Sequence, residues 1–479
     1  MTRKLLLFAI LFSGLAATAQ SGYEIQVTLK PFKDQYVYLG HYYGKTYPIV
    51  DSVKLDAQSK GVFKGTKKLP GGIYLIGYPN KTGFFEILID KEQRFSLVAD
   101  TATIANTIQF TNSTDNVDFL KYQQIMRDLG IRVRDLQQQL KSAGNPADSI
   151  RIREQLLATD RSINTYREDL IKNQGNTLLG ALMQCMREPI LSEELKRPTN
   201  KVDSLAAYRF FKDHYWDGTN FWDGRLAYTT FFEEKLDRYF KQVVAPDPDS
   251  VIREIDQMLA FAQIDPEMNR FLLIKFINRY LNQQYMWEDA VFVHLYEKYF
   301  ANKTYEWLNE KGVKLVQDRA YSLMANILGT PAAEVELPDS TGVVRPLYDL
   351  KSEYTLVIFW DPTCGHCKET LPRVDSMYRA KWSKQGLGIY SIAKETEGNR
   401  KNWLDFIQQN KLTGWTHVYY SKQSEKQRID AGMPGYSQLF DIQTFPTLYL
   451  LDRDKRIVAK KLTFEQMDEI FELRRAEKK

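Results

Sequence analysis

The sequence predicts a multidomain protein with an N-terminal antiparallel β domain, a middle all-α domain and a C-terminal α/β domain. The chain has 479 residues, whereas single hydrophobic cores stop growing near about 250–300 residues. Short β-rich runs divided by turns come first, and apolar residues at three- and four-residue spacing follow them. Strands that alternate with helices occupy the C-terminal third.

The bulk composition is that of a folded protein. Hydrophobic residues make up 43% of the sequence and charged residues 26%, without low-complexity tracts. The net charge is +5, and Lys and Arg are interspersed with acidic residues instead of forming a basic stripe. We therefore expect no nucleic-acid partner.

The first residues have the features of a secretory signal peptide. Arg3 and Lys4 give a positive start, residues 5–17 are almost wholly apolar, and residues 17–19 (Ala-Thr-Ala) form a small-x-small cleavage site. We expect residues 1–19 to be removed and the mature protein to be soluble and exported, to the periplasm or, alternatively, to the outer surface. An uncleaved membrane anchor is the other alternative, and the lack of a Cys at the cleavage site disfavours a lipoprotein.

Residues 20–112 are predicted to form a β-sandwich-like domain. Turn signals such as Lys60-Gly61 and Pro79-Asn80 separate short β-rich runs. The expected strands are residues 23–29, 35–43, 62–65, 72–77, 84–89 and 94–98.

Residues 113–327 are predicted to be helical. Asn145-Pro146 and Asp247-Pro248 each place a capping side chain before a Pro at the first helical position. The aromatic stretch at residues 208–222 is interpreted as packing between helices, with a ligand groove as the alternative.

Residues 328–479 are predicted to form the α/β domain, because Gly329 and Pro331 end the helical region. The expected strands are residues 354–360, 387–393, 416–420, 447–451 and 456–460, and the expected helices are residues 364–382, 400–409 and 464–475.

A CxxC motif stands where the first of these strands ends and a helix begins. Cys364 and Cys367 are two of only three cysteines in the chain. At a helix N-terminus, unpaired amide groups and the helix dipole favour a thiolate over a thiol, so Cys364 is the expected nucleophile. Cys367, one helical turn further, is expected to be buried and to attack the resulting mixed disulfide.

The surroundings of this motif resemble the thioredoxin fold, in particular the exported bacterial branch of TlpA-type and ResA-type proteins. The resemblance covers residues 330–479 and rests on Trp360, on the CxxC pair, on Pro372, and on the segment 443–447 before a strand. Residues 20–327 are similar to uncharacterised modules that precede thioredoxin domains in exported bacterial proteins, a likeness that implies no chemistry.

The resemblance implies several roles for residues near the cysteines. The proline equivalent to Pro446 is cis in that fold and packs beside the disulfide, and a cis bond costs little at proline. We expect Trp360, His366 and Phe445 to line the substrate groove with Pro446.

One position departs from the thioredoxin pattern. Thioredoxins place a buried acid two residues before the Trp, where this chain has Ile358. In the exported branch a Glu after the next strand accepts the proton instead, which implies Glu395, with Glu397 as its rival. Two solvated acids without such a role are the alternative.

The expected activity is thiol-disulfide exchange with protein substrates, and its direction stays open. The Gly-His dipeptide between the cysteines favours an oxidant, because a His can stabilise the thiolate. The TlpA-type resemblance favours a reductase, which implies a membrane electron-transfer partner. No cofactor is expected besides the redox-active Cys364–Cys367 disulfide.

Two other functions stay open. A Cu(I) metallochaperone would use both cysteines with His366 or His417, because soft thiolates suit that ion. A partner-binding protein would use residues 20–327 for recognition and the redox module secondarily. Cys185 is expected to be a buried, inert thiol.

Overall fold

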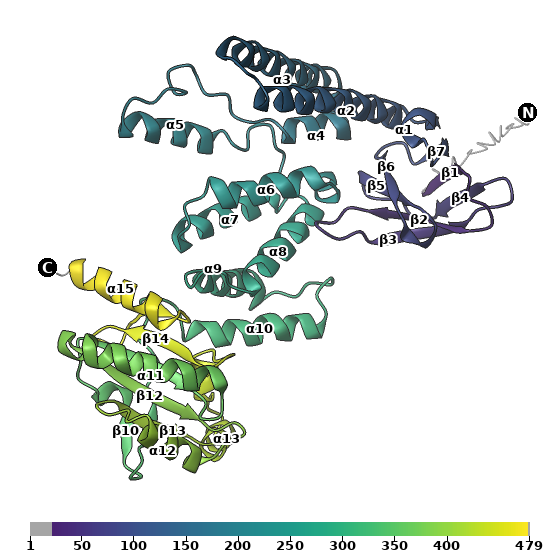
Figure 1. Cartoon of the computed structure of the whole chain (residues 1–479). Helices are drawn as coiled ribbons and strands as arrows, with labels where there is room; N and C mark the ends of the chain where they lie inside the picture. The colour runs from purple at the N-terminus through teal and green to yellow at the C-terminus, as the bar shows by residue number, and fades with distance from the viewer. Residues whose placement is uncertain (1–21, 478–479) are drawn as a thin grey trace, which may run out of the picture. The chain divides into compact units, whose positions relative to one another are not determined.

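The computed structural model describes residues 22–477, so the predicted signal peptide lies outside the described residues. Strands come first along the chain, helices follow, and an α/β domain ends it (Figure 1). The predicted fold class is therefore confirmed.

The chain divides into two compact units. One comprises the residues up to 244 together with 258–271, and the other comprises 245–257 together with 272–479. The earlier helices thus belong with the N-terminal strands, and the later ones belong with the α/β domain. The domain boundaries at residues 20–112, 113–327 and 328–479 stay a prediction.

Two four-stranded sheets form the β part of the first unit. The strands are β1 (Tyr23–Lys30), β2 (Tyr36–His41), β3 (Ile49–Lys54), β4 (Lys60–Gly65), β5 (Gly72–Gly77), β6 (Phe84–Ile89), β7 (Arg94–Asp100) and β8 (Gln109–Thr111). Their orders are β4-β1-β7-β8 and β3-β2-β5-β6, with all neighbours antiparallel except β1 and β7. Ile25, Val37 and Phe95 come from both sheets and share one hydrophobic core.

The helices of the first unit are α1 (Ile104–Thr107), α2 (Thr114–Lys141), α3 (Pro146–Gln174), α4 (Leu178–Cys185), α5 (Lys201–Asp213) and α6 (Thr230–Gln242). Asn145 caps α3, as predicted, by accepting a hydrogen bond from the Asp148 amide at 2.9 Å. The buried Asn116 side chain binds both backbone groups of Leu88, so it joins α2 to β6. In the aromatic stretch, the Tyr215 ring packs 4.8 Å from that of Tyr239 on α6, which agrees with packing between helices.

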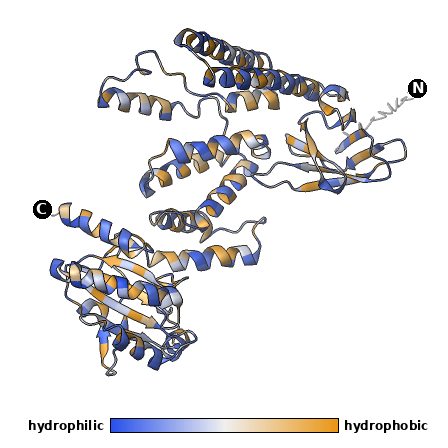
Figure 2. Cartoon of the chain, viewed as in Figure 1, coloured by the Kyte–Doolittle hydropathy of each residue, from blue (hydrophilic) through white to orange (hydrophobic). Residues whose placement is uncertain are grey.

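The later helices are α7 (Pro248–Ala262), α8 (Pro266–Leu281), α9 (Glu288–Leu295) and α10 (Glu310–Met324), of which α7 and α8 each contribute residues to both units. Asp247 accepts a hydrogen bond from the Ser250 amide at 2.9 Å at the start of α7, which confirms the predicted helix start. Hydrophilic and hydrophobic residues alternate along the helices (Figure 2), and no helix between residues 22 and 477 is long and apolar enough to cross a membrane.

A five-stranded sheet organises the α/β domain. Its strands are β11 (Tyr354–Trp360), β12 (Leu387–Lys394), β13 (Thr416–Tyr420), β14 (Thr447–Leu451) and β15 (Ile457–Lys460), in the order β13-β12-β11-β14-β15. β11, β12 and β13 run parallel, whereas β14 is antiparallel to both β11 and β15.

Hydrophobic cores cover both faces of this sheet. Side chains alternate between the faces along a strand, so Leu356 and Ile358 of β11 join one core and Val357 and Phe359 join the other. The first core is completed by α11 (Gly365–Ala380), α12 (Arg400–Gln409) and α15 (Phe464–Glu477), and the second by α14 (Tyr436–Leu439) and the segment 332–350. Every residue of β11 is buried.

A buried ion pair joins α9 to the sheet. The Lys460 ammonium of β15 pairs with Asp289 of α9, and both side chains are less than 5% exposed, at 1% and 4%. The same ammonium donates to the backbone carbonyl of Asn326. Burial lowers the pKa of Lys460, while the Asp289 carboxylate opposes that shift.

We predict that Asp289→Asn destabilises the second unit by about 3–5 kcal/mol, because it leaves the Lys460 charge buried without a counter-ion. Urea unfolding measures the loss, and Asp289→Leu combined with Lys460→Met should recover most of it. Asp430→Asn removes an exposed ion pair with Lys426 and should cost less than about 1 kcal/mol. If Asp289→Asn and Asp430→Asn lowered the free energy of unfolding equally, the buried pair would stabilise the protein no more than an exposed pair does.

Candidate redox site

Cys364 occupies the N-cap of α11, directly after the chain leaves β11. Its backbone is extended, with φ −68° and ψ 126°, and Gly365 begins the helix. The Cys364 side chain is partly exposed, whereas Cys367 is fully buried. The structure therefore presents one thiol of the pair at the surface and covers the other.

The segment before β14 lies opposite Cys364. β11 and β14 are antiparallel, with Phe359 paired to Thr447, so the end of β11 meets the start of β14. The Phe445–Pro446 peptide bond is cis, as the resemblance implied. The Cys364 thiol donates to the Phe445 carbonyl, with 3.7 Å between sulfur and oxygen.

The environment of Cys367 favours its protonated form. Burial raises the pKa of the Cys367 thiol well above its usual value, and contacts with Cys364 and the Asp361 charge raise it further. A backbone hydrogen bond from Asp361 acts in the opposite direction. Because a thiolate is the nucleophile, Cys367 needs to lose its proton before it can attack.

Asp361 is the acidic residue that the sequence analysis missed. The residue is only 7% exposed. One oxygen accepts hydrogen bonds from the Thr363 amide and hydroxyl, each at 2.7 Å, and the other accepts from the Thr396 hydroxyl. The signal available in the sequence was an acid directly after a buried strand and three residues before Cys364.

Glu395 lies on the loop after β12, where the resemblance placed it. Its carboxylate accepts a hydrogen bond from the Lys422 amide at 3.1 Å and interacts with the Tyr419 hydroxyl. Glu397 is exposed on the same loop. The proton-accepting role of Glu395 stays a prediction, and Asp361 is the carboxylate whose charge acts on Cys367.

Trp360 does not line a groove, and the sequence-based prediction is wrong for this residue. Its side chain is 0% exposed within the core below α11. The indole nitrogen donates to the Ser391 hydroxyl at 2.8 Å, and the ring packs 5.2 Å from that of Phe406. As the last residue of a wholly buried strand, Trp360 supports the site from beneath.

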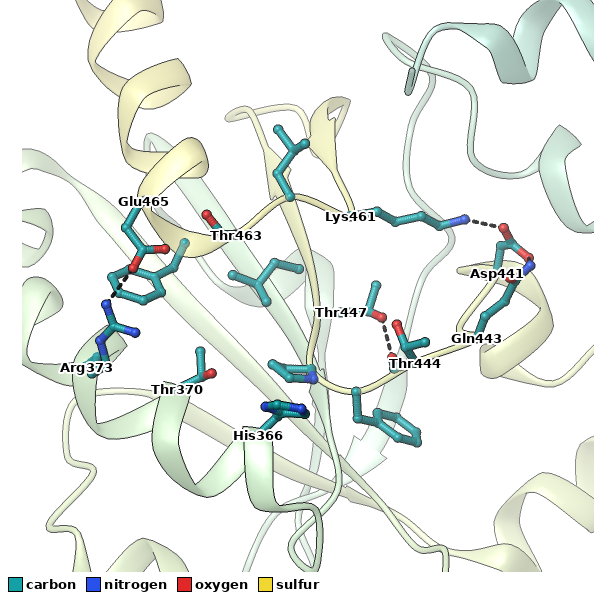
Figure 3. Close-up of a pocket in the computed structure, with 15 residues that line it drawn as sticks. His366, Thr370, Arg373, Asp441, Gln443, Thr444, Thr447, Lys461, Thr463 and Glu465 are labelled. Atoms are coloured by element: carbon teal, nitrogen blue, oxygen red, sulfur yellow. Dashed lines mark hydrogen bonds and ion pairs between the residues drawn. The ribbon is translucent and has the colours of Figure 1, made fainter. Parts of the chain in front are cut away.

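A pocket of about 480 Å³ lies beside the cis-proline segment. His366, Phe445 and Pro446 line it, and their role in a substrate groove stays a prediction. In Figure 3, residues of α11 such as Thr370 lie on one side of the pocket, and Gln443 and Thr444 lie on the other. Its charged side chains are paired with one another, Arg373 with Glu465 and Lys461 with Asp441.

The copper alternative would use Cys364 and Cys367 with His366 or His417. Among residues 22–477, no three His, Cys, Asp or Glu side chains are grouped so that they could hold a metal ion. The His417 ring stacks on Trp415 with 5.4 Å between centroids, and its Nε2 donates to the Leu412 carbonyl at 3.0 Å.

Cys185 is fully buried, and burial raises its thiol pKa to about 11, as expected of an inert thiol.

Two protein families match parts of the chain. Residues 352–457 match the family described as thioredoxin-like, and residues 193–319 match a domain of unknown function, DUF5106. With the strand order of the sheet, the first match shows that the C-terminal domain is thioredoxin-like. No curated protein matches the chain.

Several solved structures resemble the chain over part of its length. A domain of a possible thiol-disulfide isomerase from Cytophaga hutchinsonii is 32% identical, with 32% of this chain and 95% of that chain covered and a TM-score of 0.27. A thioredoxin-like protein from Bacteroides caccae is 20% identical over 60% of this chain and 98% of that chain, with a TM-score of 0.43. The thioredoxin domain of a thiol-disulfide oxidoreductase from Bacteroides vulgatus is 25% identical, with 30% of this chain and 96% of that chain covered and a TM-score of 0.25.

We predict that Asp361→Asn lowers the pKa of Cys367, because it removes a nearby negative charge that raises this pKa. Thiolate absorbance at 240 nm, followed against pH in a background that carries both Cys185→Ser and Cys364→Ser, measures this change. Glu395→Gln in the same background serves as the matched control and should leave the titration unchanged. A shift caused by Glu395→Gln alone would instead identify Glu395 as the acid coupled to the pair.

Proposed function

We propose that the chain is an exported thiol-disulfide oxidoreductase that exchanges disulfides with protein substrates through Cys364 and Cys367. One observation carries the proposal: a partly exposed thiol at a helix N-terminus lies above a buried partner thiol and faces a cis-proline segment. A helix N-terminus stabilises the anionic form of a sulfur placed there.

The first step joins enzyme and substrate. The Cys364 thiolate attacks one sulfur of the substrate disulfide, so that a new S–S bond forms and the substrate S–S bond breaks. The leaving substrate sulfur takes up a proton. The Phe445 carbonyl contacts the attacking sulfur, and the pocket that Phe445 and Pro446 line would hold the substrate chain.

The second step releases the substrate. Cys367 loses its proton, for which Asp361 and Glu395 are the candidate acceptors, and attacks the Cys364 sulfur. The mixed disulfide breaks and the second substrate sulfur leaves as a thiol. The substrate has then gained two electrons and two protons, and the enzyme holds the Cys364–Cys367 disulfide; the reverse sequence oxidises a substrate dithiol.

The compartment and the electron source are part of the proposal. Residues 1–19 support export, with the periplasm as the destination. A reductase there would need a membrane dithiol donor to return its disulfide to the dithiol form, whereas an oxidant would need an acceptor. The Gly365-His366 pair supports the oxidising direction, and the TlpA-type resemblance supports the reducing one.

We predict that the full chain accelerates dithiothreitol-driven reduction of insulin and that Cys364→Ser lowers this rate at least about 100-fold, because the attacking sulfur is lost. Cys367→Ser should retain the first step and accumulate a mixed disulfide at Cys364, visible by mass spectrometry without reductant. Cys185→Ser is the matched control and should keep the wild-type rate. An active Cys364→Ser protein would refute the proposed function.

A further inference from the structure

Arg319 of α10 reaches from the helical part of the second unit into the α/β domain. Its guanidinium donates to Asp441 at 2.7 Å, and the two side chains are 16% and 6% exposed. The same guanidinium donates to the side chain of Gln283 and to the carbonyl of Leu281, and these two hydrogen bonds fix its position. Buried charge-assisted hydrogen bonds of this kind are directional and strong.

Asn326, just after α10, makes a second connection to the same place. It is fully buried. Its amide donates to the Leu439 carbonyl at 2.6 Å, and its carbonyl accepts from the Tyr449 hydroxyl at 2.9 Å. That hydroxyl shares its single proton with a second acceptor, the Phe440 carbonyl. Arg319 and Asn326 thus bind Asp441 and Leu439 directly, and the Tyr449 hydroxyl links Asn326 to Phe440 between them.

Residues 439–441 lead directly to the cis-proline segment. Asp441 has φ +43°, a left-handed conformation that an Asp tolerates but that needs support. Its carboxylate accepts a hydrogen bond from the Gln443 side chain at 3.1 Å, and Asp441, Gln443 and Phe445 all line the pocket. Figure 3 shows Asp441 and Gln443 beside Lys461 at the rim.

Asp441 is held as a carboxylate within this network. Burial alone would raise the pKa of Asp441, but the ion pairs with Lys461 and Arg319 outweigh it and lower the pKa. Since Lys461 is the more exposed of the two cations, at 34% against 16%, Arg319 is the partner whose geometry is better fixed.

We propose that Arg319 and Asn326 are positioning residues of the redox site, which hold residues 440–446 so that the Phe445 carbonyl and Pro446 face Cys364. The inference rests on the proposed function and deepens it: the helical part of the second unit sets the affinity of the site for polypeptide disulfides. Small disulfides need only the Cys364 sulfur, so their reaction rate does not depend on Arg319 and Asn326.

The first test needs no activity. Hydrogen exchange of the full chain, read by mass spectrometry, compares Arg319→Met with wild type over a peptide covering residues 440–447. We expect faster exchange in that peptide and unchanged exchange in β11, with partial restoration in Arg319→Lys, which can still donate to Asp441. The matched control is Arg345→Met, which removes the surface pair with Asp339 and should leave the 440–447 peptide unchanged.

The second test separates affinity from chemistry. Arg319→Met should raise KM for insulin about five- to tenfold with kcat within about twofold, because loop misplacement weakens substrate alignment. Reaction with a small aromatic disulfide should keep the wild-type rate. Asp441→Asn, which tolerates the left-handed backbone, should have the same effect, and the double variant should be no worse than either single one.

The two tests fail in different ways. Unchanged exchange at residues 440–447 in Arg319→Met, or equal changes in Arg345→Met, would overturn the positioning role even in an active enzyme. Additive effects of Arg319→Met and Asp441→Asn would also overturn it. A wild-type chain that neither reduces insulin nor oxidises a protein dithiol would refute the proposed function, and the hydrogen-exchange result would then decide the positioning role alone.

Discussion

The antiparallel pairing of β11 with β14 is the constraint on which the redox site depends. Phe359 of β11 pairs with Thr447 of β14, so the residues that follow β11 lie beside the residues that precede β14. Cys364 and the Phe445 carbonyl are 81 residues apart in sequence and 3.7 Å apart in space for this reason. Both faces of the sheet are buried, so a slip in register would move a whole set of apolar side chains to the wrong face.

Unequal burial gives the two cysteines different chemistry. The same helix N-terminus holds both, but one sulfur is reachable and the other lies in the core beneath α11 with Trp360. Asp361, fixed by two threonines, adds a buried negative charge next to the inner thiol. This unequal burial supports the proposed order of attack, and Asp361, one of the two candidate proton acceptors, lies in the same turn.

Local patterns predicted most of the α/β domain because apolar periodicity there reflects burial directly. The strands at 416–420 and 447–451 and the helix at 400–409 lie where they were expected. β3 and α13 (Lys422–Asp430) were missed because they bury no side chains and leave no apolar signal. Trp360 was assigned to the substrate groove from the family motif, although its place at the end of an apolar strand already indicated that it lies in the core. Arg319 and Asp441 are 122 residues apart, a contact that no local pattern encodes.

The reduction potential of the Cys364–Cys367 pair tests the central claim most directly. The full chain would be equilibrated with glutathione or dithiothreitol redox buffers, trapped by alkylation and mapped by mass spectrometry. We expect a single two-electron transition that joins Cys364 to Cys367, with a potential between about −120 and −270 mV, the range of thioredoxin-like oxidoreductases. The absence of this disulfide across that range, or a disulfide that involves Cys185 instead, would contradict the account.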